Sequence, residues 1–326
     1  MILITSAAGG VGRPLVRKLV ANGLEVRAFV KNEEQAKRAR ADGATEVVIG
    51  DLRQPGDLEK ALRGVRQVYH TAPTQLIDEV PVAKRLITAA QAEQLNAVVF
   101  QSVIHPDIAE LPHHRQKLLV EELLKESGLP VVILRPSHYM QNVLDFWDFF
   151  GAGLLPYPTS PESRMGVVDS DDIAEAGANV LANPEGHIGK TYDLSTVELT
   201  RNDMAQIWSR VLGHPVTAIR LPPQALTQPL SAVGTFGAAI TRSLLSNGLR
   251  ALPNIVRGLL SAPSARGFPN WPPDAQDTYV QMMKYYDVHG LPAGNLEDLP
   301  KVLPRPATTY EQFARRIAES HGVAAS

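Results

Sequence analysis

The first twelve residues restrict the fold more than any other part of the chain, because a short apolar run leads directly into a glycine-rich turn. Residues 1–5 have the apolar character of a buried strand, and apolar residues recur at helical spacing from Pro14 to Ala21. The turn between them reads Thr5, Ser6, Ala7, Ala8, Gly9, Gly10, Val11 and Gly12. A glycine turn between a strand and a helix is typical of α/β folds that bind dinucleotide phosphates.

The glycines of this turn have distinct expected tasks. Gly9 would let the backbone approach a pyrophosphate, and Gly12 would let the helix pack closely on the strand. Ser6 stands where the commonest form of the motif has its first glycine, so the turn is less permissive there but gains a hydroxyl. A tight turn without a ligand is the alternative. We expect phosphate contacts from the turn as a whole, which comprises Thr5, Ser6, Gly9, Gly10, Val11 and Gly12.

Strands and helices alternate through the first part of the chain. The pattern predicts further strands at 25–30, 46–49, 67–71, 97–102 and 130–134. It predicts helices between them at 33–41, 55–62, 80–93 and 115–127. Repeated βαβ units with right-handed crossovers give a doubly wound parallel Rossmann sheet of the α/β class. This context favours phosphate binding by the glycine turn over an unliganded turn.

The pattern loosens after residue 136. We expect a nucleotide-binding domain at 1–136 and a smaller, mostly helical substrate region at 137–326 that interleaves with the Rossmann core. Within the second region, helices are predicted at 171–182 and 202–212.

Residues 225–265 form an unusual segment that we interpret as a helical insertion. The segment is rich in Leu, Ala, Ser and Gly and poor in acidic residues. Residues 243–260 are expected to form an amphipathic helix pair that breaks at Pro253. A cap that packs on the core is the favoured interpretation, and a helix pair lying on a membrane surface is the other.

Charge and composition disfavour several classes of protein. The 32 Lys and Arg residues nearly balance the 34 Asp and Glu residues, so a net charge of −2 gives no basic footprint for nucleic acid. The chain has no cysteine, which excludes disulfides and thiolate metal sites, and its histidines lack metal-ligand spacing, so we expect no metal. No apolar stretch reaches the roughly 18 to 20 residues that span a bilayer. With no signal peptide before the first strand, we expect a cytoplasmic protein.

The end of the second strand bears on the choice of cofactor. A carboxylate there binds the ribose hydroxyls of NAD, whereas this chain has Lys31 and Asn32. Lys31, together with Arg27, could pair with a 2′-phosphate, which favours NADP(H) over NAD(H). A solvated loop lysine is the alternative. The adenine edge and the ribose side are assigned to residues that follow the third and fourth strands, namely Asp51, Leu52, Thr71, Ala72 and Pro73.

Several segments together resemble the NmrA-like branch of the atypical short-chain dehydrogenase/reductase superfamily. Besides the glycine turn they are VRAFVKN at 26–32, GDL at 50–52, EE at 121–122, SGL at 127–129, ILRP at 133–136, DDIA at 171–174 and PRPATTYEQF at 304–313. The resemblance implies a Rossmann domain, a smaller C-terminal substrate region and NADP(H) in the cleft between them. Members of this family include reductases of quinones, dyes and plant phenolics, and also regulators without known catalysis.

The catalytic residues of the superfamily are only partly matched. Ordinary members use a serine after the fifth strand and a Tyr-x-x-x-Lys helix, and here Ser102 stands at the strand end while the helix has His113 and Lys117. If Pro112 starts the helix, both side chains share one face. Lys117 would bond the nicotinamide ribose and orient a substrate carbonyl, or be a solvated lysine. His113 would supply a proton, or be a surface residue.

The turn after the sixth strand lies at the edge where open α/β sheets bind ligands. Pro136 is assigned to the cofactor, and His138, Tyr139 and Asn142 are assigned to the substrate, with a core aromatic as the alternative for Tyr139. The aromatic residues Phe146, Trp147, Phe149 and Phe150 are more typical of a core than of a ligand platform. Such walls suit a small, hydrophobic, aromatic substrate.

These observations favour an NADP(H)-dependent oxidoreductase that transfers hydride to a carbonyl, quinone or activated double bond of a small hydrophobic molecule. A non-catalytic NADP(H)-sensing regulator is the first alternative, because the tyrosine is missing, and residues 225–265 would then be a partner surface. A non-redox isomerase or lyase on the same fold is the second. Whether the chain forms a homodimer stays open.

Overall fold

The chain passes more than once between two structural units. The computed structural model describes residues 1–261 and 267–323. The first unit consists of Met1–Ser137, Ser170–Ser195 and Gly294–Ala307. The second consists of His138–Asp169, Thr196–Ala293 and Thr308–Ser326. The first unit therefore extends beyond residue 136 by two later segments.

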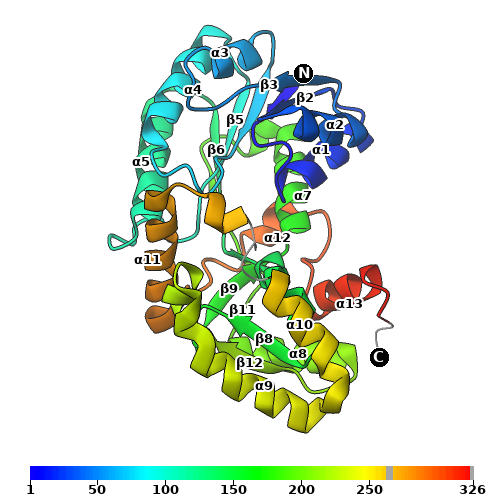
Figure 1. Cartoon of the computed structure of the whole chain (residues 1–326). Helices are drawn as coiled ribbons and strands as arrows, with labels where there is room; N and C mark the ends of the chain where they lie inside the picture. The colour runs from blue at the N-terminus through cyan, green and yellow to red at the C-terminus, as the bar shows by residue number, and fades with distance from the viewer. Residues whose placement is uncertain (262–266, 324–326) are drawn as a thin grey trace. The chain divides into compact units, whose positions relative to one another are not determined.

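A seven-stranded parallel sheet forms the centre of the first unit (Figure 1). Its strands, in spatial order, are β10 (Thr191–Leu194), β6 (Val131–Pro136), β5 (Ala97–Gln101), β4 (Gln67–His70), β1 (Ile2–Ile4), β2 (Val26–Val30) and β3 (Glu46–Ile49). The chain order reverses between β1 and β4, which is the topological switch point where such sheets bind ligands. The predicted doubly wound α/β class is confirmed.

Helices cover both faces of this sheet. On one face lie α3 (Asp57–Leu62), α4 (Val80–Ala92) and α5 (Pro112–Glu126), whose apolar residues form one core with Leu3, Val98 and Phe100 of the sheet. On the other face lie α1 (Gly12–Ala21), α2 (Glu33–Ala41) and α7 (Ser170–Ala182). Gly177 of α7 lies so close to the sheet that a Cβ would stand 2.7 Å from the Tyr69 ring.

The second unit contains two small sheets and several helices. The strands β7 (His138–Tyr139), β9 (Met165–Val168) and β11 (Val197–Leu199) form one sheet, and β8 (Leu154–Tyr157) pairs with β12 (Thr217–Arg220) in the other. Its helices are α6 (Trp147–Phe150), α8 (Arg201–Leu212), α9 (Val233–Asn247), α10 (Leu252–Ser261), α11 (Pro273–His289) and α13 (Tyr310–Ser320). The rings of Phe150 and Trp208 pack 4.9 Å apart, and Phe149 and Phe150 are fully buried. The predicted assignment to the core is confirmed for Phe146, Phe149 and Phe150, whereas Trp147 is half-buried.

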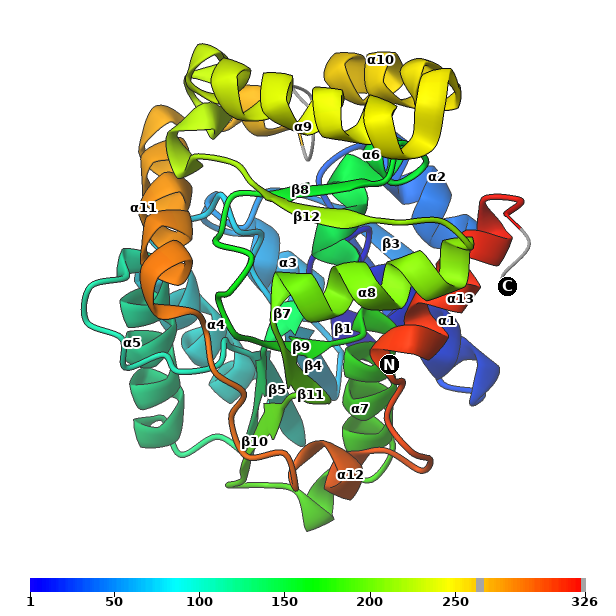
Figure 2. The same cartoon turned by 90° about the horizontal axis from the view of Figure 1, so that it is seen from below.

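The predicted break of the helix pair at Pro253 is wrong. α9 ends at Asn247, a short 3₁₀ turn spans Gly248–Ala251, and α10 begins at Leu252. Gly248 has a φ of 65°, a left-handed conformation that ends the first helix at a glycine without strain. Pro253 lies in the first turn of α10, where no intrahelical N–H bond is lost. Figure 2 shows α9 and α10 beside β8 and β12, and residues 262–265 of the predicted insertion lie outside the described residues.

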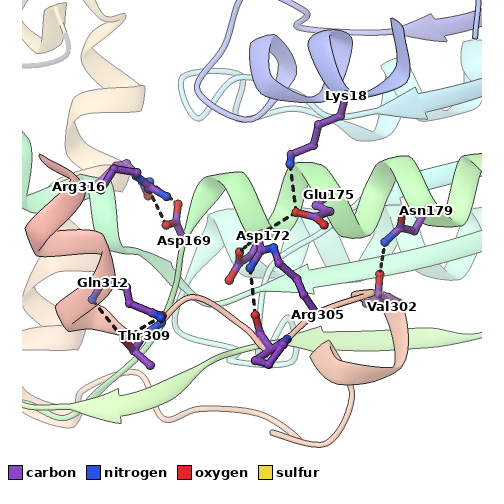
Figure 3. A network of polar contacts seen from close by, with 12 residues as sticks. Lys18, Asp169, Asp172, Glu175, Asn179, Val302, Arg305, Thr309, Gln312 and Arg316 are labelled. Atoms are coloured by element: carbon purple, nitrogen blue, oxygen red, sulfur yellow. Dashed lines mark hydrogen bonds and ion pairs between the residues drawn. The ribbon is translucent and has the colours of Figure 1, made fainter. Parts of the chain in front are cut away.

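Ion pairs attach the late segment of the first unit to its helices (Figure 3). Arg305 lies 2.8 Å from Asp172 and 2.8 Å from Glu175, two carboxylates of α7. Lys18 of α1 reaches the same Glu175 at 3.0 Å. The Asn179 side chain also donates to the Val302 carbonyl, 3.0 Å away. Contacts between residues far apart in the sequence thus hold the segment 302–305 and α1 against α7 within the first unit.

We expect Arg305→Met to lower the free energy of unfolding by about 2–3 kcal/mol, because Asp172 is fully buried and loses a charged partner. Arg315→Met is the matched control, since its pair with Glu311 is exposed on both sides and should contribute less than about 0.5 kcal/mol. Urea unfolding monitored by circular dichroism measures both changes. Equal losses for the two variants would contradict the structural role of Arg305.

Candidate cofactor and active site

Side-chain hydrogen bonds tie the β1–α1 turn to the end of β4. The Ser6 hydroxyl donates to the Thr71 carbonyl at 3.0 Å, and the Thr71 N–H donates to the Thr5 hydroxyl at 2.9 Å. Ser6 has a φ of 52°, the left-handed conformation that glycine ordinarily supplies at the first position of the motif. The hydroxyl expected to be gained there therefore holds the strained turn in place.

The three glycines of the turn differ in how much space surrounds them. A Cβ on Gly12 would lie 2.4 Å from the Ser6 carbonyl oxygen and 2.9 Å from the Ala7 Cα. A Cβ on Gly9 would lie 3.2 Å from the same oxygen, whereas one on Gly10 would meet nothing within 4 Å. Close packing thus requires glycine at Gly12 and leaves Gly10 unconstrained by its neighbours.

The N-terminus of α1 fits an anionic group. Its N-cap residue, Val11, provides no side-chain acceptor, and the first turn contains no acidic residue. The positive end of the helix dipole and its backbone N–H groups are therefore not neutralised by a side chain from this turn. The turn that contains Gly9, Gly10 and Gly12 is called the glycine cradle below, and together with it this end of α1 suits the pyrophosphate of a dinucleotide.

Of the two basic residues assigned to a 2′-phosphate, Arg27 has structural partners. Its Nε lies 2.6 Å from Glu46, and its Nη1 donates to the carbonyls of Ala61 and Arg63. Arg27 therefore supports β2, β3 and the end of α3, which argues against the expected phosphate contact. Lys31 is exposed after β2 and stays a candidate for that contact.

Arg53 is a further basic residue at this edge of the sheet, and no sequence pattern singles it out. It makes a bidentate contact with Asp51, with Nη2 2.6 Å from Oδ2, and lowers the pKa of Asp51 to about 2. Lys31 also lowers that pKa. Asp51 is thus an ionised carboxylate held by a cation, after the strand that neighbours β2.

Lys117 belongs to a buried ion pair. Its side chain is 4% exposed, and Nζ lies 2.8 Å from Oε2 of Glu79, whose side chain is 2% exposed. Nζ also lies 5.2 Å from the centre of the Phe100 ring. The alternative of a solvated lysine is therefore wrong. Burial raises the pKa of Glu79 and Lys117 opposes that rise, while Oε1 of Glu79 has no hydrogen-bond partner among the described residues.

Glu79 was not identified from the sequence. It lies at the start of α4, far from Lys117 in the chain, and an acidic residue at a helix start is too common to indicate a site. Only the packing of α4 beside α5 brings the carboxylate to the lysine.

Three histidines lie near enough to Lys117 to be affected by its charge, and the pKa of each is lowered by burial first and by Lys117 in addition. The pKa of His70 falls to about 3, and the ring stacks on Phe100. The pKa of His114 falls to about 4, although a hydrogen bond with the His105 carbonyl opposes the shift. The pKa of His113 falls well below its usual range. All three imidazoles are therefore neutral at neutral pH, which argues against His113 as an imidazolium proton donor.

Ser102 has a partner that differs from the expected one. Its hydroxyl donates to Oε1 of Glu121 at 2.6 Å, and Arg135 binds the same carboxylate at 2.6 Å through Nη2. The single proton of the Ser102 hydroxyl is therefore used inside this network, which argues against donation to a substrate.

The residues assigned to the substrate lie in the second unit. Nε2 of His138 lies 2.8 Å from the hydroxyl of Tyr157, and Tyr139 and Asn142 are half-buried. Pro136 ends β6 in the first unit, and Ala72 and Pro73 follow β4.

In the part of the chain that the structure describes, no three His, Asp or Glu side chains gather in a way that could hold a metal ion. Within the same residues, every helix is too short or too polar to cross a membrane.

Known proteins resemble the chain over nearly its whole length. The model of the NmrA-like family matches residues 1–247. An NAD(P)H azoreductase from Xenophilus azovorans is 27% identical over 329 residues, covering 99% of this chain and 100% of that protein.

Solved structures of reductases have the same fold. An NADPH-dependent quinone oxidoreductase from Escherichia coli, complexed with NADPH, is 22% identical, with a TM-score of 0.70 over 97% of this chain and 99% of that chain. A triphenylmethane reductase from Citrobacter sp., complexed with NADP(H), is 21% identical, with a TM-score of 0.68 over the same shares of the two chains, 97% and 99%.

We expect acid to destabilise the protein through its buried histidines. His70 has a folded pKa of about 3 and an unfolded pKa near 6.5, so the unfolded state binds more protons between these values. The stability contributed by the neutral ring is present above pH 6.5 and is lost as the pH falls, by about 2 kcal/mol between pH 7 and pH 5.

The variant His70→Phe should remove this part of the acid sensitivity, while the partly exposed His214, mutated to Phe, serves as the control. Urea unfolding at pH 7 and pH 5 measures the effect. If the free energy of unfolding falls as much between pH 7 and pH 5 in His70→Phe as in the original protein, His70 is not the source of the acid sensitivity.

Proposed function

Because the chain belongs to the NmrA-like family, we propose that it is an NADP(H)-dependent reductase that transfers hydride to a carbonyl, a quinone or an activated double bond of a small hydrophobic molecule. The observation that carries the proposal is the glycine cradle, in which Gly12 leaves no room for a Cβ beside an uncapped helix N-terminus. The azoreductase and the two reductases complexed with nicotinamide cofactors support the same class.

The proposed cofactor contacts follow from the first unit. Backbone N–H groups of the Gly9–Gly12 turn would hold the pyrophosphate, and the exposed Lys31 would pair with the 2′-phosphate. Lys117 would bond the nicotinamide ribose. When bound, NADPH supplies the hydride.

Among the protein's own side chains, we assign the catalytic role to Lys117 and a positioning role to Glu79. An ammonium has three N–H donors, and Glu79 accepts one of them, so two can meet a ligand hydroxyl and a substrate oxygen. The carboxylate orients the Lys117 ammonium in a place from which water is largely excluded. There, a positive charge stabilises negative charge that develops on the oxygen being reduced. Since His113 is neutral, we assign this stabilisation to Lys117 and the final proton to water.

A non-catalytic NADP(H)-sensing regulator is the second candidate function. It is favoured by one observation, namely that the residue in place of the usual tyrosine is the neutral His113. The two functions predict the same cofactor binding and differ in turnover. A non-redox isomerase or lyase would instead give product while NADPH stays unchanged.

Turnover should appear when the purified protein is mixed with NADPH and a panel of quinones and azo dyes, followed by the loss of NADPH absorbance. Lys117→Met should lower kcat at least 100-fold, because removal of one transition-state donor costs about this factor. The variant Lys125→Met, on the same helix but half-exposed, is the control. Cofactor binding without any turnover across the panel would reject the reductase in favour of the regulator.

The glycine cradle gives a separate prediction for binding. Gly12→Ala should weaken NADPH binding at least 100-fold, because the helix must move away from the Ser6 carbonyl, whereas Gly10→Ala should change it less than about threefold. NADPH fluorescence titration measures both, and circular dichroism verifies folding. Equal affinities of the two variants would contradict the cradle.

Lys31 is expected to select the phosphorylated cofactor. Lys31→Gln should weaken NADPH binding about tenfold and NADH binding little, since an ion pair to phosphate contributes on the order of 1–2 kcal/mol. Lys37→Gln on the exposed face of α2 is the charge-matched control. An equal loss for both cofactors would assign Lys31 another role.

A further inference from the structure

Arg201 of the second unit is buried in an unusual way. It is the first residue of α8, a position that faces water in most helices, yet it is only 1% exposed. Its Nε donates to the Thr159 hydroxyl at 3.2 Å, and its Nη1 lies 3.1 Å from the sulfur of Met204. Its Nη2 is buried and has no hydrogen-bond partner among the described residues.

The charge of Arg201 is not balanced by a carboxylate. Within residues 1–261 and 267–323, no Asp or Glu oxygen lies within ion-pair distance of it, whereas the buried Asp169 has Arg316 at 2.6 Å. Burial lowers the pKa of Arg201, but a guanidinium stays protonated in proteins. A buried charge without a counter-ion is strongly unfavourable, and stacking on an aromatic ring offsets only part of that cost. The arrangement therefore calls for an anion.

Tyrosine side chains lie near the guanidinium of Arg201. Its central carbon lies 4.0 Å from the centre of the Tyr157 ring, and Tyr279 and Tyr310 are close enough to influence its pKa. The hydroxyl of Tyr157 lies 2.8 Å from His138, which the sequence had already assigned to the substrate. A positive charge stacked on the Tyr157 ring, with further tyrosines nearby, matches a planar aromatic molecule that bears a negative group.

We propose that Arg201 binds a carboxylate or sulfonate group on an aromatic substrate. The unpartnered Nη2, with the weakly engaged Nη1, would present the forked pair of donors that fits two oxygens of such a group. The inference rests on the proposed reductase function for its substrate, but binding of the anion itself does not require turnover.

The first experiment compares the full chain with Arg201→Met by thermal unfolding, with benzoate, benzyl alcohol or acetate added. Benzoate should raise the Tm of the original protein and not that of Arg201→Met, and the neutral alcohol should raise neither. Without ligand, Arg201→Met should be at least as stable as the original, because the substitution removes an uncompensated buried charge. A structural role for Arg201 predicts the opposite, a clear loss of Tm.

Arg210→Met, which removes an exposed charge from the same helix, is the matched control and should keep the benzoate response. A benzoate response that persists in Arg201→Met, or a lower Tm of that variant without ligand, would overturn the proposal. If acetate raised the Tm as much as benzoate does, the inference that the bound anion is aromatic would be overturned.

The second experiment uses turnover of 1,2-naphthoquinone-4-sulfonate and of neutral 1,2-naphthoquinone with NADPH. Arg201→Met should raise KM for the sulfonated quinone at least tenfold more than for the neutral one. An equal change would overturn the assignment of substrate class. If neither quinone consumes NADPH in the original protein, the reductase proposal fails, while the benzoate experiment still decides whether Arg201 binds an aromatic anion.

Discussion

The carbonyl oxygen of Ser6 lies so close to Gly12 that no side chain fits between them, and the arrangement of the first unit depends on this approach. It sets the N-terminus of α1 at the carboxyl edge of the sheet. The hydroxyls of Thr5 and Ser6 fasten the same turn to β4, across the point where the strand order reverses. One close contact and a few hydrogen bonds therefore define where a phosphate can meet backbone N–H groups.

The first unit also contains a buried ion pair that bears on its function. Lys117 and Glu79 are buried together, and the lysine helps to keep three neighbouring histidines neutral. Such a pair is costly to bury and contributes little net stability, so its presence is better explained by a task than by folding. The task that we assign is to hold one oriented positive charge where a hydride acceptor would gain negative charge.

Much of the fold could be predicted because its signals are local. Alternating apolar runs and helical periodicity placed the strands around Val26, Gln67 and Val131 within about two residues, and the glycine turn indicated the start of α1. The helix that carries Lys117 begins at Pro112, three residues before the predicted start at residue 115, so His113 lies inside the helix. The sequence points to a break at Pro253, but proline is harmless in a first helical turn, and the first helix ends before Gly248 instead.

The site was less predictable, since its decisive contacts join distant parts of the chain. Glu79 lies 38 positions from Lys117 in the sequence. Arg27 donates to backbone carbonyls at the end of α3, which its position in the sequence does not indicate. Arg201 carries no sequence signal of burial at all. What the sequence indicated was which residue types stood at the ends of strands, and tertiary packing then selected among them.

The interleaved course of the chain has a consequence for its synthesis. Gly294–Ala307 belongs to the first unit, and Arg305 supplies the partner of the buried Asp172. A ribosome therefore has to deliver the chain as far as residue 307 before the N-terminal sheet and its helices can be completed. Until then, the surface of the first unit that Gly294–Ala307 covers would stay exposed, and Asp172 would lack its partner Arg305. The first unit therefore cannot finish folding before the second unit has been synthesised.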